Sequence, residues 1–146
     1  MTRTNQAYIE SRTRNVPHGV VTAHPLCADK AQGSLLWDVE GRRYIDFVGG
    51  IGVQNIGHNH PKVVQAVHKQ LERVSHAAFQ VAGYDVYVDL AAKLNKLVGG
   101  GEPYKTLLVT TGADAVEKAI KSARAYRNVP GIISFRGGFH GRTLLG

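Results

Sequence analysis

The last third of the chain contains an apolar run that turns abruptly into an amphipathic helical pattern. Residues 107–124 read LLVTTGADAVEKAIKSAR, which predicts a buried strand over residues 106–109 and a helix over residues 113–126. A second buried strand is predicted at residues 131–135, GIISF. Strand, helix and strand at this spacing form a right-handed βαβ unit, which requires a parallel sheet covered by helices. The sequence therefore predicts an α/β fold.

Both predicted strands end in segments suited to a binding site, because ligands of such sheets lie at the carboxyl ends of the strands. After the first strand, the amides of Gly112, Ala113 and Asp114 occupy the first turn of a helix, where they lack intrahelical partners and can donate to an anion. The alternative is that Thr111 or Gly112 only caps the helix. Neither G-x-G-x-x-G nor G-x-x-x-x-G-K-[ST] occurs here.

The second strand is followed by GGFHGR, which places an aromatic ring, an imidazole and a guanidinium in one loop: Phe139, His140 and Arg142. An aromatic face can stack on a flat heterocycle, and arginine can bind a carboxylate through two parallel hydrogen bonds. The two loops together suit a planar phosphorylated cofactor and a carboxylate substrate. The alternative is a surface loop with an incidental aromatic residue.

The first half of the chain has a different pattern. Residues 6–15 predict a short helix ended by Pro17 and Gly19, and SLLWDVEGRRYIDFVGG alternates apolar and polar positions around a turn at Glu40 and Gly41, which predicts a hairpin. The following GIGVQNIGHNHP has too many glycines for a regular element.

Two further helices are predicted between the glycine-rich segment and the βαβ unit. One begins at Pro61, and its apolar stripe is predicted to be core: Val64, Val67, Leu71 and Val74. The other begins near Asp85 as N-cap and ends at the glycines from Gly99 onward. Its buried face is predicted to hold Tyr87, Leu90, Ala91, Leu94 and Val98.

Composition narrows the class of protein. A chain of 146 residues has the size of one domain, and it contains no apolar run of transmembrane length. The net charge of +7 is spread along the chain with acids interleaved, which disfavours a nucleic-acid interface. The N-terminus lacks an apolar signal core and Cys27 is the single cysteine, so a cytoplasmic protein is expected.

Two features could suggest other chemistry. His58 and His60 in GHNHP could bind a metal, but an isolated H-x-H without neighbouring acids or cysteines is a weak signal, and no metal site is predicted. Cys27 could be a nucleophile, but no base is paired with it in the sequence, so a small apolar role is favoured.

Three motifs in order along the chain resemble one family. LWDVEGRRYIDFVGGIGVQNIGHNHPKVVQAV, LLVTTGADAVEKAIKSAR and SFRGGFHGRT are similar to the N-terminal portion of class III (fold type I) pyridoxal-phosphate aminotransferases, and among them to the 4-aminobutyrate type. The resemblance implies a mainly parallel sheet and pyridoxal 5'-phosphate as cofactor. It further implies that residues 1–60 begin the small domain and that residues 61–146 begin the large, cofactor-binding domain.

The resemblance assigns cofactor-binding roles residue by residue. Gly112 and Ala113 match positions whose amides hold the cofactor phosphate, and Phe139 matches the residue that stacks on the pyridine ring, with His140 beside it. Glu117 matches an acidic position with a supporting role. The family usually has serine in place of Ala113, so one possible hydrogen bond to the phosphate is lost while the backbone amide remains.

The substrate side follows from the same resemblance. Arg142 matches the residue that binds the substrate carboxylate, Ile51 an apolar residue lining the same pocket, and Gln80 a segment near the active site. The implied reaction moves an amino group from 4-aminobutyrate or a related ω-amino acid to a 2-oxo acid such as 2-oxoglutarate, in a homodimer. Acetylornithine or another ω-amine stays open as donor, as does a non-catalytic phosphate-binding module.

Transamination also needs a lysine that forms a Schiff base and an acid against the pyridine nitrogen. In the family both follow the position of Arg142 by a long interval, and no lysine of this chain matches the lysine motif. The chain is therefore expected to be an N-terminal fragment with an incomplete large domain, inactive by itself.

Overall fold

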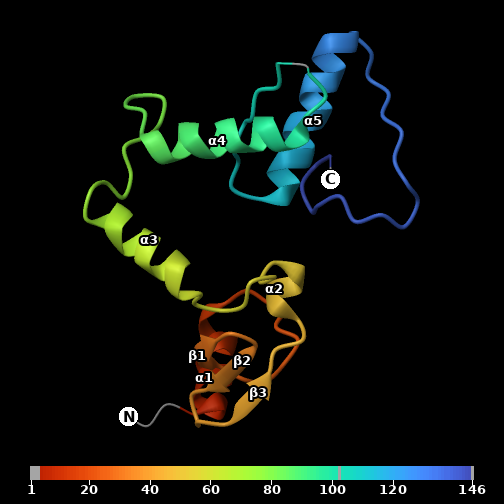
Figure 1. The fold of residues 1–146 in the computed structure, drawn as a ribbon. Coiled ribbons are helices and arrows are strands. Elements are labelled where there is room, and N and C mark those ends of the chain that lie inside the picture. The colour runs from red at the N-terminus through yellow and green to blue at the C-terminus, as the bar shows by residue number, and fades with distance from the viewer. Residues whose placement is uncertain (1–3, 102, 146) are drawn as a thin grey trace. The chain divides into compact units, whose positions relative to one another are not determined.

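The computed structural model describes residues 4–101 and 103–145. The chain divides into two compact units, Met1–His76 and Ala77–Gly146, whose helices and strands are labelled in Figure 1. The predicted domain boundary between residues 60 and 61 stays a prediction. Within the described residues, no helix is both long enough and apolar enough to cross a membrane.

The first unit begins with α1 (Asn5–Asn15), which confirms the predicted N-terminal helix. Thr4 caps it, since the Thr4 side chain accepts a hydrogen bond from the Ala7 amide at 3.1 Å. The helix ends where Val16 becomes extended, as expected for a residue that precedes proline.

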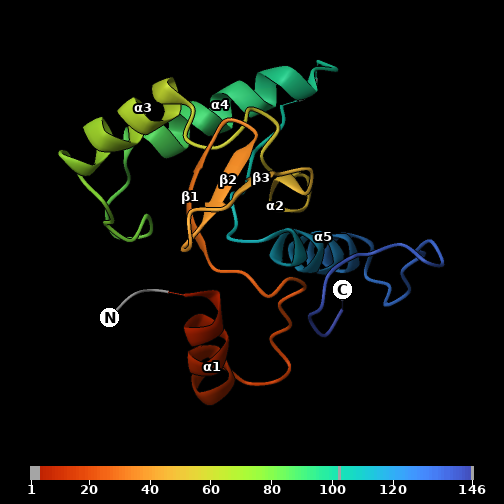
Figure 2. The ribbon, with the colours of Figure 1, turned by 90° about the horizontal axis from the view of Figure 1, so that it is seen from below.

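A three-stranded antiparallel sheet follows, in the order β1–β2–β3 (Figure 2). The predicted hairpin is confirmed as β2 (Leu35–Asp38) and β3 (Arg43–Ile45), and Gly41 takes the positive φ of 80° in its turn. The strand β1 (Ala28–Gln32) was not predicted, because its sequence ADKAQ lacks the β-branched and aromatic residues that favour strands. It pairs with β2, and the ammonium of Lys30 lies 5.1 Å from the centre of the Trp37 ring.

The hairpin turn is organised by a buried carboxylate. Asp38 is only 1% exposed and accepts five hydrogen bonds: from the side chains of Asn5, Arg42 and Tyr44 and from the amides of Glu40 and Arg42. Burial opposes ionisation, but the hydrogen bonds outweigh it and hold the pKa of Asp38 well below its ordinary range. This carboxylate therefore joins α1 to the hairpin.

The glycine-rich segment contains one short turn, α2 (Gly49–Gly52), and then α3 (Pro61–Leu71) begins at the predicted proline. The prediction that the apolar stripe of α3 is core is wrong for this structure: Val67 is 52% exposed and Leu71 58% exposed. The reason is that burial of an amphipathic face requires a second apolar surface, and the described residues of this unit do not cover the stripe.

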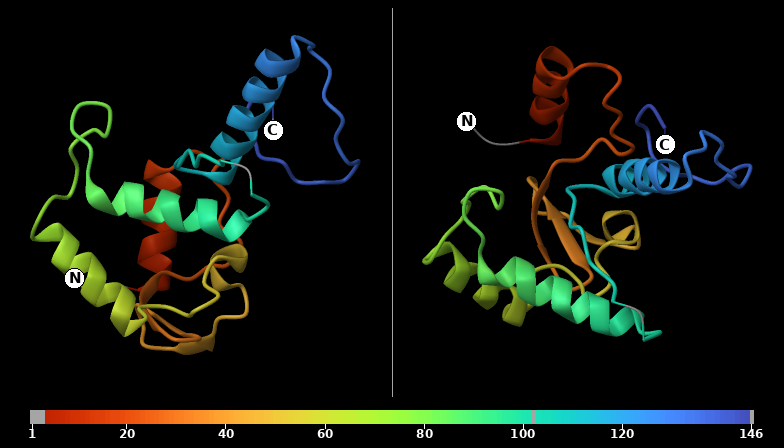
Figure 3. Two further views of the ribbon diagram at one scale, coloured as in Figure 1. Left: turned by 45° about the horizontal axis from the view of Figure 1, so that its top comes forward. Right: turned by 90° about the horizontal axis from the view of Figure 1, so that it is seen from above.

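The second unit contains α4 (Asp85–Val98) and α5 (Gly112–Arg127), which confirm two predicted helices. The N-cap of α4 is Tyr84, and the predicted cap Asp85 is instead the first residue of the helix. Gly99 ends the helix with a φ of 70°. Of the five side chains predicted to be buried, those of Tyr87, Ala91 and Leu94 are half-buried. Leu90 and Val98 are exposed. After α5 the chain moves away and returns beside the same helix (Figure 3).

The two predicted strands of the βαβ unit are absent from the described residues, because residues 106–109 and 131–135 have no strand assignment. Ile133 and Phe135 are 101% and 87% exposed. A parallel strand needs neighbouring strands to bond its amides and carbonyls and helices to cover both its faces. The described residues of this unit supply no such neighbours, and none of the described apolar side chains in either unit is fully buried.

Candidate functional site

The turn before α5 forms a capped helix N-terminus, in which some backbone amides remain available as hydrogen-bond donors. Thr111 is the N-cap, and its hydroxyl oxygen accepts from the Asp114 amide at 3.0 Å. The predicted donor on Asp114 is therefore already used, which corrects the expectation of three available amides. The amides of Gly112 and Ala113 precede the first intrahelical hydrogen bond and remain donors. A Cβ placed on Gly112 would meet no atom within 4 Å, so a ligand can approach this backbone closely.

The Thr111 cap is expected to stabilise α5. Thr111→Ala removes the acceptor for the Asp114 amide and should destabilise α5 by about 1 kcal/mol, measured by urea unfolding followed by circular dichroism. Thr111→Ser keeps the hydroxyl and serves as the matched control. Equal destabilisation by alanine and serine would show that the hydroxyl does not cap the helix.

Glu117 on α5 holds the segment that follows Arg142. Its carboxylate accepts from the Leu145 amide at 3.0 Å and lies 3.4 Å from the Lys121 ammonium. A hydrogen bond from Thr143, then that from Leu145, holds the pKa of Glu117 below its ordinary value. Because Glu117 lies five residues after Gly112, roughly 7.5 Å along the helix axis, this contact brings the neighbours of Arg142 to the N-terminal half of α5.

The loop residues differ in exposure. The Phe139 ring is 80% exposed and Arg142 is exposed, so both side chains are accessible to a ligand. His140 is half-buried and lines a cavity of about 570 Å³ between α5 and the returning chain, together with Val116, Ile120 and Arg124. The His140 Nε2 and Arg124 Nε atoms are buried without a hydrogen-bond partner among the described residues. Such nitrogens favour a polar occupant in this cavity.

The remaining predicted site residues lie elsewhere in the chain. Gln80 is an exposed residue of the turn at residues 78–81 that precedes α4. Ile51 belongs to the first unit, where it is 89% exposed in α2. Gly112, Ala113, Gln80 and the loop after Gly138 thus belong to one unit, and Ile51 belongs to the other.

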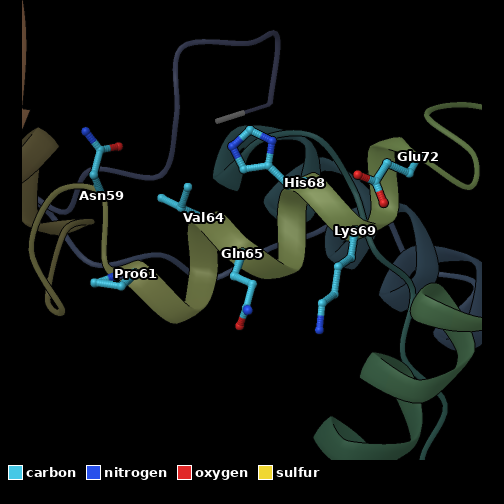
Figure 4. Close-up of a pocket in the computed structure, with 7 residues that line it drawn as sticks. All are labelled: Asn59, Pro61, Val64, Gln65, His68, Lys69 and Glu72. Carbon is cyan, nitrogen blue, oxygen red and sulfur yellow. The ribbon is translucent and has the colours of Figure 1, made fainter.

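A groove along α3 is not lined by any predicted site residue. Its volume is about 770 Å³, and Figure 4 shows its lining, which comes from the start and one face of that helix: Asn59, Pro61, Val64, Gln65, His68, Lys69 and Glu72. Its lining mixes polar and apolar side chains.

Comparison with known proteins identifies the family of the chain. The family described as class-III aminotransferase matches residues 16–146, a range that includes α5, Phe139 and Arg142. The chain belongs to the class III aminotransferase family. This family depends on pyridoxal phosphate, and a solved Toxoplasma gondii ornithine aminotransferase, at 26% identity and a TM-score of 0.80 over 98% of this chain and 34% of that one, is described with pyridoxal phosphate at its active site.

Among curated relatives, the chain is 54% identical to 5-aminovalerate aminotransferase DavT of Pseudomonas putida over 99% of its own length and 34% of that protein. It is 50% identical to 4-aminobutyrate aminotransferase GabT of Escherichia coli over 95% of this chain and 33% of that protein. A second Toxoplasma gondii ornithine aminotransferase structure matches 97% of this chain and 34% of that one with a TM-score of 0.82 and 29% identity. The chain thus spans about a third of the length of these relatives.

The residues present fit the family's cofactor. A phosphate group would meet two available amides, those of Gly112 and Ala113, at the positive end of the 16-residue helix α5. Phe139 offers an exposed aromatic face for a pyridine ring. The assignments of Gly112, Ala113, Phe139, His140, Ile51, Gln80 and Arg142 to cofactor or substrate stay predictions.

Proposed function

We propose that this chain is part of a pyridoxal-phosphate-dependent aminotransferase that takes the amino group of 4-aminobutyrate or 5-aminovalerate and transfers it to a 2-oxo acid such as 2-oxoglutarate. The observation that carries the proposal is the 50% and 54% identity to 4-aminobutyrate and 5-aminovalerate aminotransferases. Both 4-aminobutyrate and 5-aminovalerate are ω-amino acids, with an amine at one end and a carboxylate at the other.

The available groups support separate roles for the two ends of such a substrate. The amides of Gly112 and Ala113 bind the cofactor phosphate, and the Phe139 ring orients the cofactor by stacking. Arg142 binds the substrate carboxylate, which keeps the amine at the far end of the methylene chain directed to the cofactor. When bound, pyridoxal phosphate supplies an electron sink for the carbon that carries the amine. No lysine of this chain matches the family's Schiff-base lysine motif.

The experiment is a titration of the complete enzyme, extended to the length of its relatives, with pyridoxal phosphate. We expect an absorption band of enzyme-bound cofactor that changes when 4-aminobutyrate or 5-aminovalerate is added, and no such change with an amine that lacks a carboxylate at the same concentration. A protein that shows no absorption change with pyridoxal phosphate would contradict the proposal and would favour a non-catalytic phosphate-binding module.

Acetylornithine is an alternative amino donor, suggested by one of the similar solved structures. An acetylornithine aminotransferase from Elizabethkingia anophelis matches 86% of this chain and 30% of that one with a TM-score of 0.75 and 32% identity. A higher kcat/KM for acetylornithine than for 4-aminobutyrate or 5-aminovalerate would favour that donor. The proposed enzyme is a homodimer, as the family resemblance implies, and it is located in the cytoplasm.

A further inference from the structure

A pair of side chains closes the glycine-rich loop between β3 and α3. The carboxylate of Asp46 and the Nε2 atom of His58 are 2.7 Å apart, and the two side chains are only 13% and 20% exposed. The other Asp46 oxygen accepts from the amides of Val48 at 3.0 Å and Gly49 at 2.9 Å. A single carboxylate therefore contacts both ends of the loop.

The backbone fixes the same two ends to the sheet. His58 and Gly33 exchange two hydrogen bonds, of 2.8 and 2.9 Å, and the Asp46 amide donates to the Ser34 carbonyl at 2.8 Å. Gly33 and Ser34 lie in the connection between β1 and β2. The loop of residues 47–57 thus starts and ends at one place on the sheet.

Between these ends the loop adopts a conformation that most residues avoid. The φ angles of Gly49, Gly50 and Gly52 are 51°, 64° and 78°, which glycine adopts freely. Ile51 between them has φ 61° and ψ 54°, a left-handed conformation that is costly for a β-branched side chain. Since the Ile51 side chain is 89% exposed, its own packing does not offset this cost. The turn is instead held by hydrogen bonds from the amides of Gly52 and Val53 to the carbonyls of Val48 and Gly49, at 3.0 and 2.9 Å, and by the contacts at the loop ends.

We propose that the Asp46–His58 pair is a positioning pair, which holds residues 47–57 in the left-handed turn that presents Ile51 to the methylene chain of the ω-amino acid. This proposal rests on the proposed function. Strained backbone is often found at ligand-binding sites, and here it occurs at an exposed apolar residue of a loop whose two ends are both held by hydrogen bonds. Neither Asp46 nor His58 contacts the substrate, since both act on the position of Ile51 through the loop.

The electrostatics of the pair agree with this role. The hydrogen bond with His58, followed by that from the Gly49 amide, holds the pKa of Asp46 below its ordinary value. The carboxylate is therefore ionised at neutral pH and can accept from all three donors. Hydrogen bonds to a charged acceptor are stronger than neutral ones, so loss of one donor should loosen the whole loop.

The first test measures hydrogen exchange of the loop in the complete enzyme before any cofactor is added. His58→Ala should speed hydrogen exchange of the Val48 and Gly49 amides by about tenfold. His58→Gln places an amide nitrogen near the position of Nε2 and should restore slow exchange, while His18→Ala, a change at an exposed histidine, should have no effect. Unchanged exchange in His58→Ala would overturn the proposal.

The second test measures substrate binding in the complete enzyme. His58→Ala should raise the KM for 4-aminobutyrate by about tenfold with little change in kcat or in the absorption of bound pyridoxal phosphate, and His58→Gln should recover most of the loss. Ile51→Gly relieves the backbone strain but removes the side chain, so it should raise KM without faster exchange. Faster exchange with an unaltered KM would overturn the positioning role.

The two proposals fail in different ways. A wild-type enzyme that binds no pyridoxal phosphate would refute the proposed function, and with it the substrate contact of Ile51, whatever the exchange rates show. An active wild-type enzyme whose His58→Ala variant keeps its KM would refute only the positioning role.

Discussion

Replacing Arg142 with alanine in the complete enzyme should raise the KM for 4-aminobutyrate by ~10- to 100-fold and leave the affinity for pyridoxal phosphate nearly unchanged. A charge-assisted, two-point hydrogen bond to a carboxylate accounts for a loss of this size. Arg142 is exposed on the loop that Glu117 holds against α5, so its removal should not disturb the helix that offers amides to the phosphate.

Arg136 provides the matched control for this experiment, because it is an exposed arginine at the start of the same loop. Arg136→Ala should change neither KM nor cofactor affinity by more than about twofold. A second variant, Arg142→Lys, keeps the charge but loses the planar fork and should recover only part of the affinity. Loss of pyridoxal phosphate in Arg142→Ala with an unchanged KM would contradict the carboxylate role.

Replacing Asp38 with alanine should lower the melting temperature of the first unit by roughly 10 °C, because this substitution breaks a buried hydrogen-bond network. Asn5, Arg42, Tyr44 and two amides would lose their shared acceptor, and buried donors without acceptors are costly. The contact with Asn5 also joins α1 to the hairpin, so the first helix should lose structure together with the sheet.

Differential scanning calorimetry and far-ultraviolet circular dichroism measure this effect, with Asp29→Ala as control. Asp29 is an exposed carboxylate on β1, next to the strand that carries Asp38, and its removal should shift the melting temperature by no more than about 2 °C. Similar shifts for the two variants would show that general charge, and not the network at Asp38, sets the stability.

The same carboxylate predicts how stability depends on pH. The folded pKa of Asp38 lies below the unfolded value of about 3.9, so the folded state gains stability at every pH above that value. This contribution should decrease as the pH falls below about 4 toward the folded pKa. Asp38→Asn should therefore be less stable than wild type at neutral pH and show a flatter loss of stability between about pH 4 and pH 2.

Local signals explain which elements the sequence could predict. Pro61 at the first position of α3, Gly99 after α4 and the threonine before α5 each act within one or two turns of a helix, and all three helices form where predicted. The hairpin follows in the same way from alternation around Gly41. By contrast, ADKAQ becomes a strand only because β2 lies beside it, which no local pattern in β1 indicates.

The sequence could not predict what depends on distant partners. Residues 106–109 and 131–135 have the composition of buried strands, but a parallel strand forms only beside other strands, and the described residues supply none. The site shows the same division: the helix N-terminus at Gly112 was predictable from its neighbours, whereas the contact of Glu117 with Leu145 spans 28 residues and Asp46 with His58 spans 12. The aspartate that precedes the glycines and the histidine that follows them were the available signals for the latter pair.

The decisive measurement for the proposed reaction is amino-group transfer by the complete enzyme. The enzyme loaded with pyridoxal phosphate is incubated with nitrogen-15-labelled 4-aminobutyrate or 5-aminovalerate and unlabelled 2-oxoglutarate, and the products are analysed by mass spectrometry. We predict that the label appears in glutamate in both reactions and that Arg142→Ala slows its appearance at low donor concentration. Absence of labelled glutamate with every ω-amino acid, from an enzyme that binds pyridoxal phosphate, would contradict the account.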